Sequence, residues 1–452
     1  MNKDFVFPTT RDNGLLMHER FKYKTKEDLI RKAKELGYDL PFSDDITPLL
    51  QSFNLSGFTV SNRMVVQPME GYDSENDGSP SELTKRRYLR YSSGGSGIIW
   101  YEAVSVVHEG RSNPHQLWIH KKNSDLYSRL NDEVRKGAAS NNIDPFLVIQ
   151  LTHSGRYSKP EGKTKPLVAA YNHLLDKTPH HILTDDELKR IMDRFVETSK
   201  LAFRAGFNAV DLKACHGYLI VDLLAGRTRR NSIFGGEETS GRFRFLNETF
   251  DRIRDEVPGI IVTTRLSISD HYRGGFGVDS DGQTDFTEPL MLVDQLKSRG
   301  MNLLNITMGS PYFNPHVNRP YDNPLPGQEV PDEHPLVGVM RMISGTSFYQ
   351  SRFPEIAVAG SAYSYLRHFS PNIGAEVLKR GDAKFIGLGR NSFAYPSMPN
   401  DLMKTGKADP RKACITCSGC TRLIRNLRPG GCVIHDREIY GTELKKLIAD
   451  GK

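Results

Sequence analysis

The sequence predicts an α/β protein, a (β/α)8 TIM barrel with an N-terminal extension and a C-terminal cysteine-rich tail. Two observations predict this fold. Eight short apolar segments alternate with amphipathic helical segments over roughly 350 residues, as in a closed parallel barrel. Polar motifs follow these segments directly, as active-site residues follow barrel strands. A doubly wound open sheet is the alternative, but no G-x-G-x-x-G motif follows the first strand.

The predicted strands are short and largely apolar, which is typical of parallel strands covered by helices. In chain order they are Met64–Gln67, Ile98–Glu102, Phe146–Leu151, Ala209–Lys213, Ile260–Arg265, Asn302–Thr307, Ile356–Gly360 and Lys384–Leu388. The helix before the fourth strand shows the pattern of the intervening segments. Thr184 and Glu187 form a capping box, apolar residues recur on one face, and Gly206 ends the helix.

Three segments follow from this reading: an extension over residues 1–45, the barrel over 46–405 and the tail over 406–452. The extension contains one predicted helix, at residues 25–37. A long proline-rich loop over residues 308–345 follows the sixth strand. Because barrel active sites lie at the carboxyl ends of the strands, this loop either covers the substrate or is a rigid surface excursion.

Composition excludes several classes of protein. The chain has 452 residues, 38% of them hydrophobic and 25% charged, as expected for a soluble globular protein. No apolar run is long enough to span a bilayer, and the first residues lack the apolar core of a signal peptide. The net charge of +7 would suit anionic substrates or a phosphate-bearing cofactor, or be a solvated surface. No basic tract indicates nucleic-acid binding, and we expect a cytoplasmic protein without membrane association.

Four of the five cysteines lie in one cluster near the C-terminus, with the spacing C-x2-C-x2-C-x11-C. They are Cys414, Cys417, Cys420 and Cys432. Four thiolates form a soft ligand set that suits an iron–sulfur cluster or zinc. The fifth, Cys215, is expected to be packed in the barrel.

The strand-end motifs together carry a family resemblance. They are NRMVVQPMEGY at 62–72, YEAVSVVHEGR at 101–111, QLTHSGR at 150–156, DLKACHGYLIVDLLAGRTRRNSIFGG at 211–236, TTRLS at 263–267, AVAGS at 357–361 and IGLGR at 386–390. Their order resembles the old yellow enzyme family of FMN-dependent NAD(P)H:flavin oxidoreductases over residues 45–400. The resemblance implies a barrel enzyme that holds FMN at the carboxyl ends of its strands.

The resemblance assigns residues to the flavin ring. An isoalloxazine needs hydrogen bonds at its pyrimidine end and a cation near N1. Gln150 resembles the pyrimidine-binding glutamine of the family, and Arg265 resembles the arginine near N1. Pro68, Met69 and Ala103 resemble residues that line the ring.

The FMN phosphate needs backbone N–H groups at close approach and a cation. Gly360 and Ser361 end the seventh strand, and Gly389 and Arg390 end the eighth. This is where barrels of this type place a phosphate site.

The substrate side departs from the family pattern. Lys213 and His216 stand where many members have H-x-x-H or H-x-x-N, a pair that binds a carbonyl oxygen. Tyr218 matches the tyrosine that donates a proton in alkene reduction. Glu70 stands where many relatives have a small residue, and its carboxylate would disfavour a reduced flavin anion unless a cation such as Lys213 offsets it. Lys213 also suggests a substrate with an anionic group.

The tail resembles the iron–sulfur segment of longer members, such as 2,4-dienoyl-CoA reductase and trimethylamine dehydrogenase. There a [4Fe–4S] cluster exchanges electrons with FMN, and nucleotide-binding domains follow. The third cysteine here is one residue closer to the second, so a cluster, zinc and an unmetallated tail all stay open. Arg422, Arg425 and Arg428 either guide an acidic electron-donor protein or form a solvated helix face.

We therefore expect an FMN-dependent oxidoreductase that reduces an activated C=C bond of enone or enoate type. Hydride would come from flavin N5, with Tyr218 as proton donor, and NAD(P)H or an external electron carrier would be the reductant. A dehydrogenase working in the oxidative direction is the first alternative. A non-flavin barrel with a four-cysteine zinc interaction module is the second.

Overall fold

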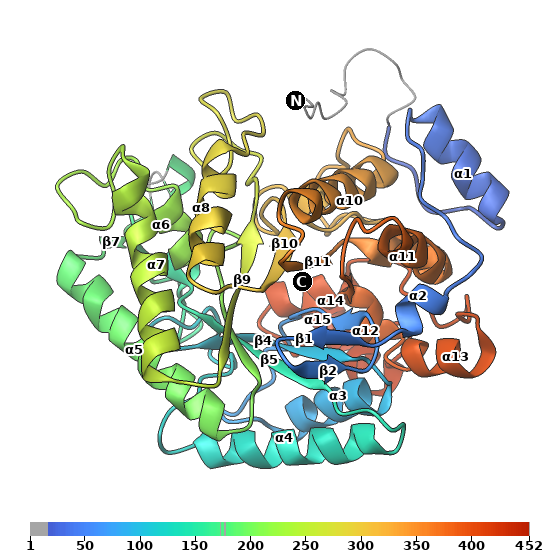
Figure 1. Cartoon of the computed structure of the whole chain (residues 1–452), viewed down its shortest axis with the longest axis horizontal. Helices are drawn as coiled ribbons and strands as arrows, with labels where there is room; N and C mark the ends of the chain where they lie inside the picture. The colour runs from blue at the N-terminus through green and yellow to red at the C-terminus, as the bar shows by residue number, and fades with distance from the viewer. Residues whose placement is uncertain (1–16, 172, 176–177, 452) are drawn as a thin grey trace.

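Eight parallel strands form a closed barrel with helices around it in the computed structural model (Figure 1), which describes residues 17–171, 173–175 and 178–451. The strands follow each other around the barrel in chain order, and β12 pairs with β3 to close it, Ile386 facing Met64. The barrel strands are β3 (Met64–Val66), β4 (Ile98–Ser105), β5 (Phe146–Thr152), β8 (Ala209–Leu212), β9 (Ile261–Ser267), β10 (Leu303–Thr307), β11 (Ala357–Gly360) and β12 (Phe385–Leu388). The predicted (β/α)8 fold is confirmed, and the open-sheet alternative is wrong.

The helices connect and cover these strands. The longer ones are α3 (Glu82–Ser93), α4 (Ser124–Ala139), α5 (Asp185–Arg204), α7 (Thr239–Glu256), α8 (Thr287–Ser298), α10 (Pro335–Arg352) and α11 (Ser370–Lys379). The shorter ones are α6 (Leu219–Leu224), α9 (Pro315–Asn318), α12 (Arg390–Ala394) and α13 (Met398–Thr405), with 3₁₀ turns at Gly155–Tyr157, His173–Leu175 and Tyr363–Phe369. The predicted capping box of α5 is present, with Thr184 and Glu187 each accepting a backbone N–H from the other.

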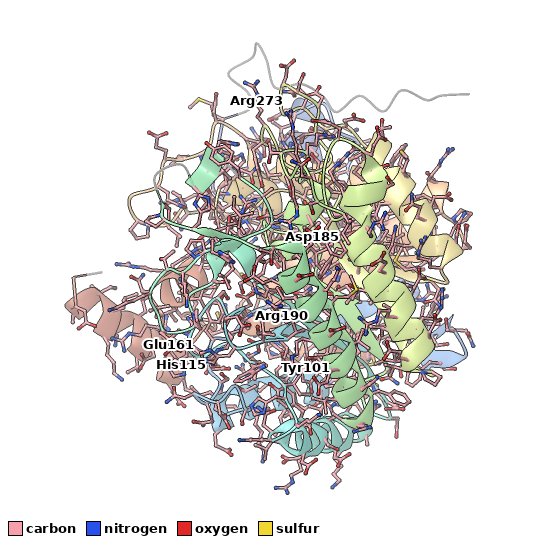
Figure 2. The ribbon with its side chains drawn as sticks, turned by 90° about the vertical axis from the view of Figure 1, so that its left-hand side faces the viewer. Tyr101, His115, Glu161, Asp185, Arg190 and Arg273 are labelled. Atoms are coloured by element: carbon pink, nitrogen blue, oxygen red, sulfur yellow. The ribbon has the colours of Figure 1, made fainter. Side chains whose placement is uncertain are left out.

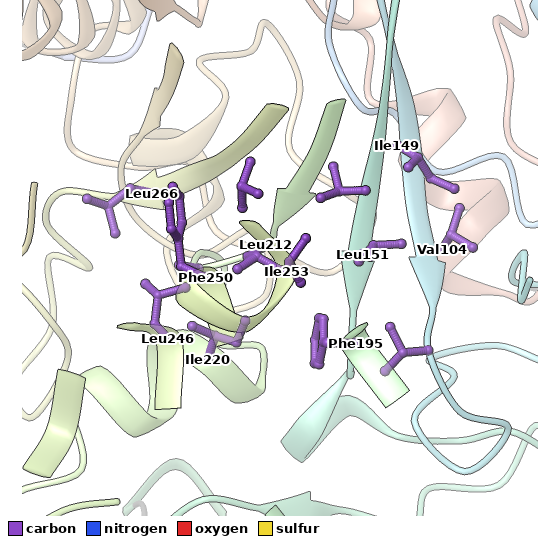
Figure 3. Packing of buried hydrophobic residues seen from close by; sticks show 14 of the residues in the cluster. Val104, Ile149, Leu151, Phe195, Leu212, Ile220, Leu246, Phe250, Ile253 and Leu266 are labelled. Atoms are coloured by element: carbon purple, nitrogen blue, oxygen red, sulfur yellow. The ribbon is translucent and has the colours of Figure 1, made fainter. Parts of the chain in front are cut away.

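Outward-facing strand residues pack against the helices and form the main core. Figure 3 shows Leu151, Leu212 and Leu266 of the strands opposite Phe195 of α5 and Phe250 of α7. All of these side chains are buried. This packing fixes the strand ends, and hence the site, because close-packed interiors resist displacement.

A hairpin that the sequence analysis missed covers the amino end of the barrel. Strands β1 (Phe53–Leu55) and β2 (Phe58–Val60) pair antiparallel across Ser56 and Gly57, both with positive φ. Such a two-residue turn favours a hairpin. Phe53 packs edge-on to Phe385 at the start of β12, with ring centroids 5.2 Å apart. A further small pair, β6 (Leu167–Val168) and β7 (His181–Ile182), lies in the loop after β5.

The extension and the tail both pack on the barrel. The predicted N-terminal helix is present as α1 (Lys26–Glu35), and α2 (Thr47–Leu50) precedes the hairpin. The tail contains α14 (Gly419–Arg425), a π-helical turn at Arg437–Gly441 and α15 (Thr442–Ala449). Gly430 donates its N–H to the Gly71 carbonyl at 2.6 Å, and Asp436 pairs with Arg86 of α3 at 2.8 Å. The limits of the three segments stay a prediction.

In the part of the chain that the structure describes, no helix has both the length and the apolar content needed to cross a membrane. The first 16 residues, on which the expectation about a signal peptide rests, lie outside the described residues. The cytoplasmic location stays a prediction.

Candidate active site

One cavity collects most of the predicted flavin and substrate residues beyond the carboxyl ends of the strands. Residues from four barrel strands or their following loops, from the proline-rich loop after β10 and from α14 line it together. They are Pro68, Met69, Glu70, Tyr72, Gln150, Lys159, Lys213, His216, Tyr218, Arg265, Pro311, Tyr312, Asn318, Arg319, Thr421, Ile424 and Arg425. Ala103 is not among the described residues that line it. This residue is buried in β4, where its carbonyl accepts a hydrogen bond from Gln116 at 2.9 Å.

The predicted pyrimidine-binding side is held by a buried carboxylate. Gln150 donates to Asp211 at 2.6 Å, and Asp211 also accepts the Trp100 indole N–H at 2.8 Å. Burial raises the pKa of Asp211 to about 6, although these donors oppose the shift. The Arg265 backbone N–H also donates to this carboxylate, at 2.6 Å, so Asp211 positions both predicted flavin contacts.

The predicted phosphate side lies where β11 and β12 end. The Arg265 guanidinium bonds the side chain of Gln67, which in turn donates to the Gly360 carbonyl and the Ser361 hydroxyl, each at 3.2 Å. Arg390 donates one N–H to the Pro320 carbonyl at 2.5 Å. Gly389 directly precedes Arg390, at the start of α12.

Several guanidinium atoms on this side are buried without a partner among the described residues. They are Nη1 of Arg390, Nη1 of Arg319 and Nε of Arg265. Burial, and then the nearby Arg390, lower the pKa of Arg319 to about 9. Unpaired buried donors of a charged group are costly, so this arrangement calls for an anion. The residues present therefore suit FMN, whose phosphate Arg390 would hold, whose ring Arg265 would face and whose pyrimidine edge Gln150 would bind.

The substrate side is organised around Tyr218. The Tyr218 hydroxyl donates to Glu70 Oε1 at 3.1 Å and lies 3.1 Å from the Tyr312 hydroxyl. Lys213 Nζ lies 3.1 Å from the same Glu70 oxygen and 3.5 Å from the centre of the Tyr218 ring. Burial, and then the Glu70 carboxylate, raise the pKa of Tyr218 well above its ordinary value. The phenol is therefore protonated at neutral pH, as a proton donor requires.

The contact between Lys213 and Glu70 changes the expected role of Lys213. The sequence suggested that its ammonium could hold an anionic substrate group. In the structure Glu70 already pairs with that charge, and Lys213 in turn offsets the Glu70 carboxylate.

His216 lies on the turn that follows β8. His216 and Gly217 both have positive φ, 64° and 72°, and this turn leads back to Tyr218 at the start of α6. His216 Nε2 lies 2.9 Å from the Asn318 amide nitrogen, a contact that assigns Nε2 as the acceptor. Burial, followed by the charges of Arg265 and Lys213, lowers the pKa of His216 well below its usual range. His216 is therefore a neutral imidazole in this cavity.

Sequence reasoning missed a stacked wall of the cavity. The Tyr312 ring stacks on Tyr157 at 3.8 Å between centroids, and the Arg425 guanidinium lies 3.7 Å above the Tyr312 ring. The proline-rich loop, for which covering the substrate was one of two open readings, contains Tyr312, and four of its residues line the cavity. The sequence left Arg425 either guiding an acidic electron donor or lying on a solvated helix face. In the structure the tail folds back over the barrel, and Arg425 lines the cavity and donates to the Pro311 carbonyl at 2.6 Å.

The four tail cysteines line a second cavity, next to the first. Cys414, Cys417, Cys420 and Cys432 share it with Arg390, the predicted phosphate residue. Among the described residues, no three His, Cys, Asp or Glu side chains are placed to hold a metal ion. Cys215 lies apart from them in the barrel, where burial raises the pKa of its thiol to about 12, as expected of a packed cysteine.

The fold and the cavity define a class, the TIM-barrel oxidoreductases with a flavin site at the carboxyl ends of the strands. The family model of the NADH:flavin oxidoreductase / NADH oxidase family matches residues 48–317. The chain belongs to this family, and the resemblance to old yellow enzyme is confirmed. The prediction of an FMN-dependent oxidoreductase is confirmed at the level of the family.

Individual relatives agree with this assignment. NADPH dehydrogenase of Clostridium acetobutylicum is 34% identical over 51% of this chain and 66% of its own length. NADPH dehydrogenase of a Geobacillus species is 27% identical over 78% of this chain and 93% of its own. The chain thus spans slightly under two thirds of the Clostridium relative.

Solved structures share the fold at low identity. A 2-naphthoyl-CoA reductase complex superposes with a TM-score of 0.72 at 18% identity, over 88% of this chain and 58% of that chain. The old yellow enzyme homologue of Zymomonas mobilis superposes with a TM-score of 0.62 at 18% identity, over 86% of this chain and 98% of that chain. Histamine dehydrogenase of Rhizobium sp. 4-9 superposes with a TM-score of 0.67 at 19% identity, over 87% of this chain and 53% of that chain.

Proposed function

We propose that this chain reduces an activated C=C bond of enone or enoate type. The observation that carries the proposal is the buried, protonated Tyr218 hydroxyl, which shares one cavity with the predicted flavin contacts Gln150 and Arg265. FMN, when bound there, would provide the hydride chemistry at the β-carbon of the alkene. Tyr218 supplies the proton to the α-carbon, so that one hydride and one proton are added across the double bond.

The neighbours of Tyr218 favour this role. Its hydroxyl donates to Glu70, which leaves the oxygen free to accept the Tyr312 proton at 3.1 Å. Tyr312 is thus placed to return a proton after Tyr218 has released its own. Glu70 keeps the phenol protonated through its charge, and Lys213 balances that charge. Because His216 is neutral, it would orient a substrate oxygen through a hydrogen bond rather than through a positive charge.

Charge disfavours the oxidative alternative with a cationic amine as substrate. Lys159, Lys213, Arg265, Arg319 and Arg425 line the cavity, and Glu70 is its single lining carboxylate among the described residues. That carboxylate is already paired with Lys213. A cationic substrate would therefore enter a cavity of its own sign.

The test is Tyr218→Phe in the FMN-loaded protein, measured by stopped-flow. Tyr72→Phe is the matched control, since it removes another phenol of the same cavity that bonds Ser112 at 2.7 Å and also interacts with Glu70, while Tyr218 stays in place. Reoxidation by 2-cyclohexenone should slow by about a hundredfold or more in Tyr218→Phe, with flavin reduction near normal. An alkene rate as fast as that of Tyr72→Phe would remove Tyr218 from the role of proton donor.

We further propose that the four cysteines hold a [4Fe–4S] cluster. All four line one cavity, which supports a shared cofactor. The four thiols form a soft, sulfur-rich ligand set of the kind that iron–sulfur clusters use. Arg390 lines this cavity and begins α12 just after β12, so the cysteine cavity adjoins the predicted phosphate site.

A cluster here would supply single electrons to the flavin site from an acidic electron-donor protein, and NAD(P)H is the alternative reductant. Anaerobic purification followed by iron and sulfide analysis tests its presence. We expect about four irons per FMN, lost in Cys417→Ser and retained in Cys215→Ala, whose cysteine lies outside the tail. Full FMN with iron near zero in the unaltered protein would rule the cluster out.

A further inference from the structure

The cations of the main cavity differ in how their charges are balanced. Lys213 is paired with Glu70. Arg265 and Arg319 lie on the predicted FMN side, where a bound phosphate and reduced ring would supply negative charge. Lys159 and Arg425 are left, and among the described residues neither has a carboxylate partner. Two unbalanced cations in a partly buried cavity call for an anion.

These two residues come from segments that the fold brings together. Lys159 follows the turn after β5, and its backbone is fixed by a hydrogen bond from its N–H to the Arg111 carbonyl at 2.9 Å. Arg425 ends α14 of the tail. A methyl group added at Gly162 would lie 3.5 Å from Leu427, so the loop after β5 contacts the tail. Figure 2 shows Glu161 of this loop beside the tail helices.

Charge repulsion acts across the gap between these cations. Burial lowers the pKa of Lys159, and the positive charge of Arg425 lowers it further, whereas Glu70 acts in the opposite direction. Arg425 is oriented by its stack on Tyr312 and its bond to Pro311. Tyr312 also contacts Tyr218, so an anion at this wall lies on the same side of the cavity as the proposed proton donor.

We propose that Lys159 and Arg425 form a carboxylate anchor for the substrate, and that this site selects anionic enoates over neutral enones. The inference rests on the proposed reduction of an activated C=C bond. In this proposal Lys213, whose ammonium is paired, does not select the charge of the substrate. One residue of the loop after β5 and one residue of the tail do so. Lys159 and Arg425 are positioning residues, because they hold the substrate without taking part in hydride or proton transfer.

Equilibrium binding tests the anchor without requiring turnover. Isothermal titration of the FMN-loaded protein with 3-phenylpropanoate and with 3-phenylpropanamide compares an anion with its neutral analogue. The unaltered protein should bind the carboxylate about tenfold more tightly or better, as expected for a charge-assisted contact. Lys159→Met should lose about tenfold of this preference, whereas Lys159→Arg should keep it.

Lys163→Met is the matched control, because Lys163 is an exposed lysine of the same loop. It should leave the preference unchanged. Arg425→Gln provides a second variant should Lys159→Met lose FMN, and it should weaken carboxylate binding while amide binding stays within about twofold. Equal binding of both ligands by the unaltered protein, or an unchanged preference in Lys159→Met and Arg425→Gln, overturns the anchor.

The two proposals fail separately. A protein that loses its preference in Lys159→Met but reduces neither cinnamate nor cinnamaldehyde supports the anchor and refutes the proposed reduction. A protein that reduces both at equal kcat/KM, with binding unaffected by the variants, supports the reduction and refutes the anchor.

Discussion

The buried pair between Lys213 and Glu70 gives the sharpest test of how this cavity is held. Their side chains are 4% and 14% exposed, and Nζ and Oε1 lie 3.1 Å apart. Glu70→Gln removes the negative charge and leaves the ammonium facing the ring of Tyr218. At an effective dielectric of about 20, the lost attraction is about 5 kcal/mol. The glutamine oxygen can still accept a hydrogen bond, so we expect a net loss of about 3 kcal/mol in the free energy of unfolding.

The double variant Glu70→Gln with Lys213→Met separates the effect of the unpaired charge from the loss of the contact itself. Because Lys213→Met removes the charge that Glu70→Gln leaves unpaired, the double variant should be more stable than Glu70→Gln alone, by about 1 to 2 kcal/mol. Urea unfolding followed by circular dichroism gives the midpoints, with Glu329→Gln in an exposed position as the control. A Glu70→Gln midpoint equal to that of Glu329→Gln would refute the reasoning. So would a double variant that loses the sum of the two single losses.

Three further predictions concern the cofactor site, the pH dependence and the tail. Arg390→Gln should weaken FMN binding by about tenfold or more, measured by fluorescence of released flavin, because it removes the cation from the predicted phosphate site. Burial lowers the pKa of His153 to about 4; the unfolded chain gains this proton below about pH 6.5. The contribution of neutral His153 to the free energy of unfolding is therefore complete above that pH and decreases as the pH drops, by roughly 2 kcal/mol at pH 5. His153→Gln should make the thermal midpoint depend less on pH. Asp436→Asn, which breaks the contacts of this buried carboxylate with two arginines of α3, should speed proteolysis of the tail before the barrel.

Local sequence patterns were enough to predict most of the fold. Hydrophobic periodicity located all eight barrel strands within a few residues, since a buried parallel strand must be short and apolar. β4 is longer than predicted and reaches Ser105, across an irregularity between Tyr101 and Ala103. The β1–β2 hairpin was missed because its strands have three residues each, too few for a periodic signal.

Some features of the candidate site could likewise be predicted from local motifs, whereas others depend on contacts between residues far apart in the chain. The strand-end motifs placed Gln150, Arg265 and Tyr218 in one cavity, because a barrel brings the carboxyl ends of its strands together. Ala103 lies within β4, outside the lining of that cavity, and its carbonyl accepts a hydrogen bond from Gln116. No local pattern indicated that Lys213 would pair with Glu70, which lies 143 positions away.

The sequence by itself determined the barrel and the clustering of the four cysteines, because these depend on periodicity and on short spacing, whereas the predicted flavin contacts rest on the family resemblance of the strand-end motifs. Only the tertiary structure decided which charges remain unbalanced. The sequence left Arg425 either guiding an acidic electron donor or on a solvated helix face, and the return of the tail to the barrel, through Gly430 and Gly71, places it at the cavity beside Lys159. Electrostatic balance depends on distances between residues far apart in the chain, and only packing fixes those distances.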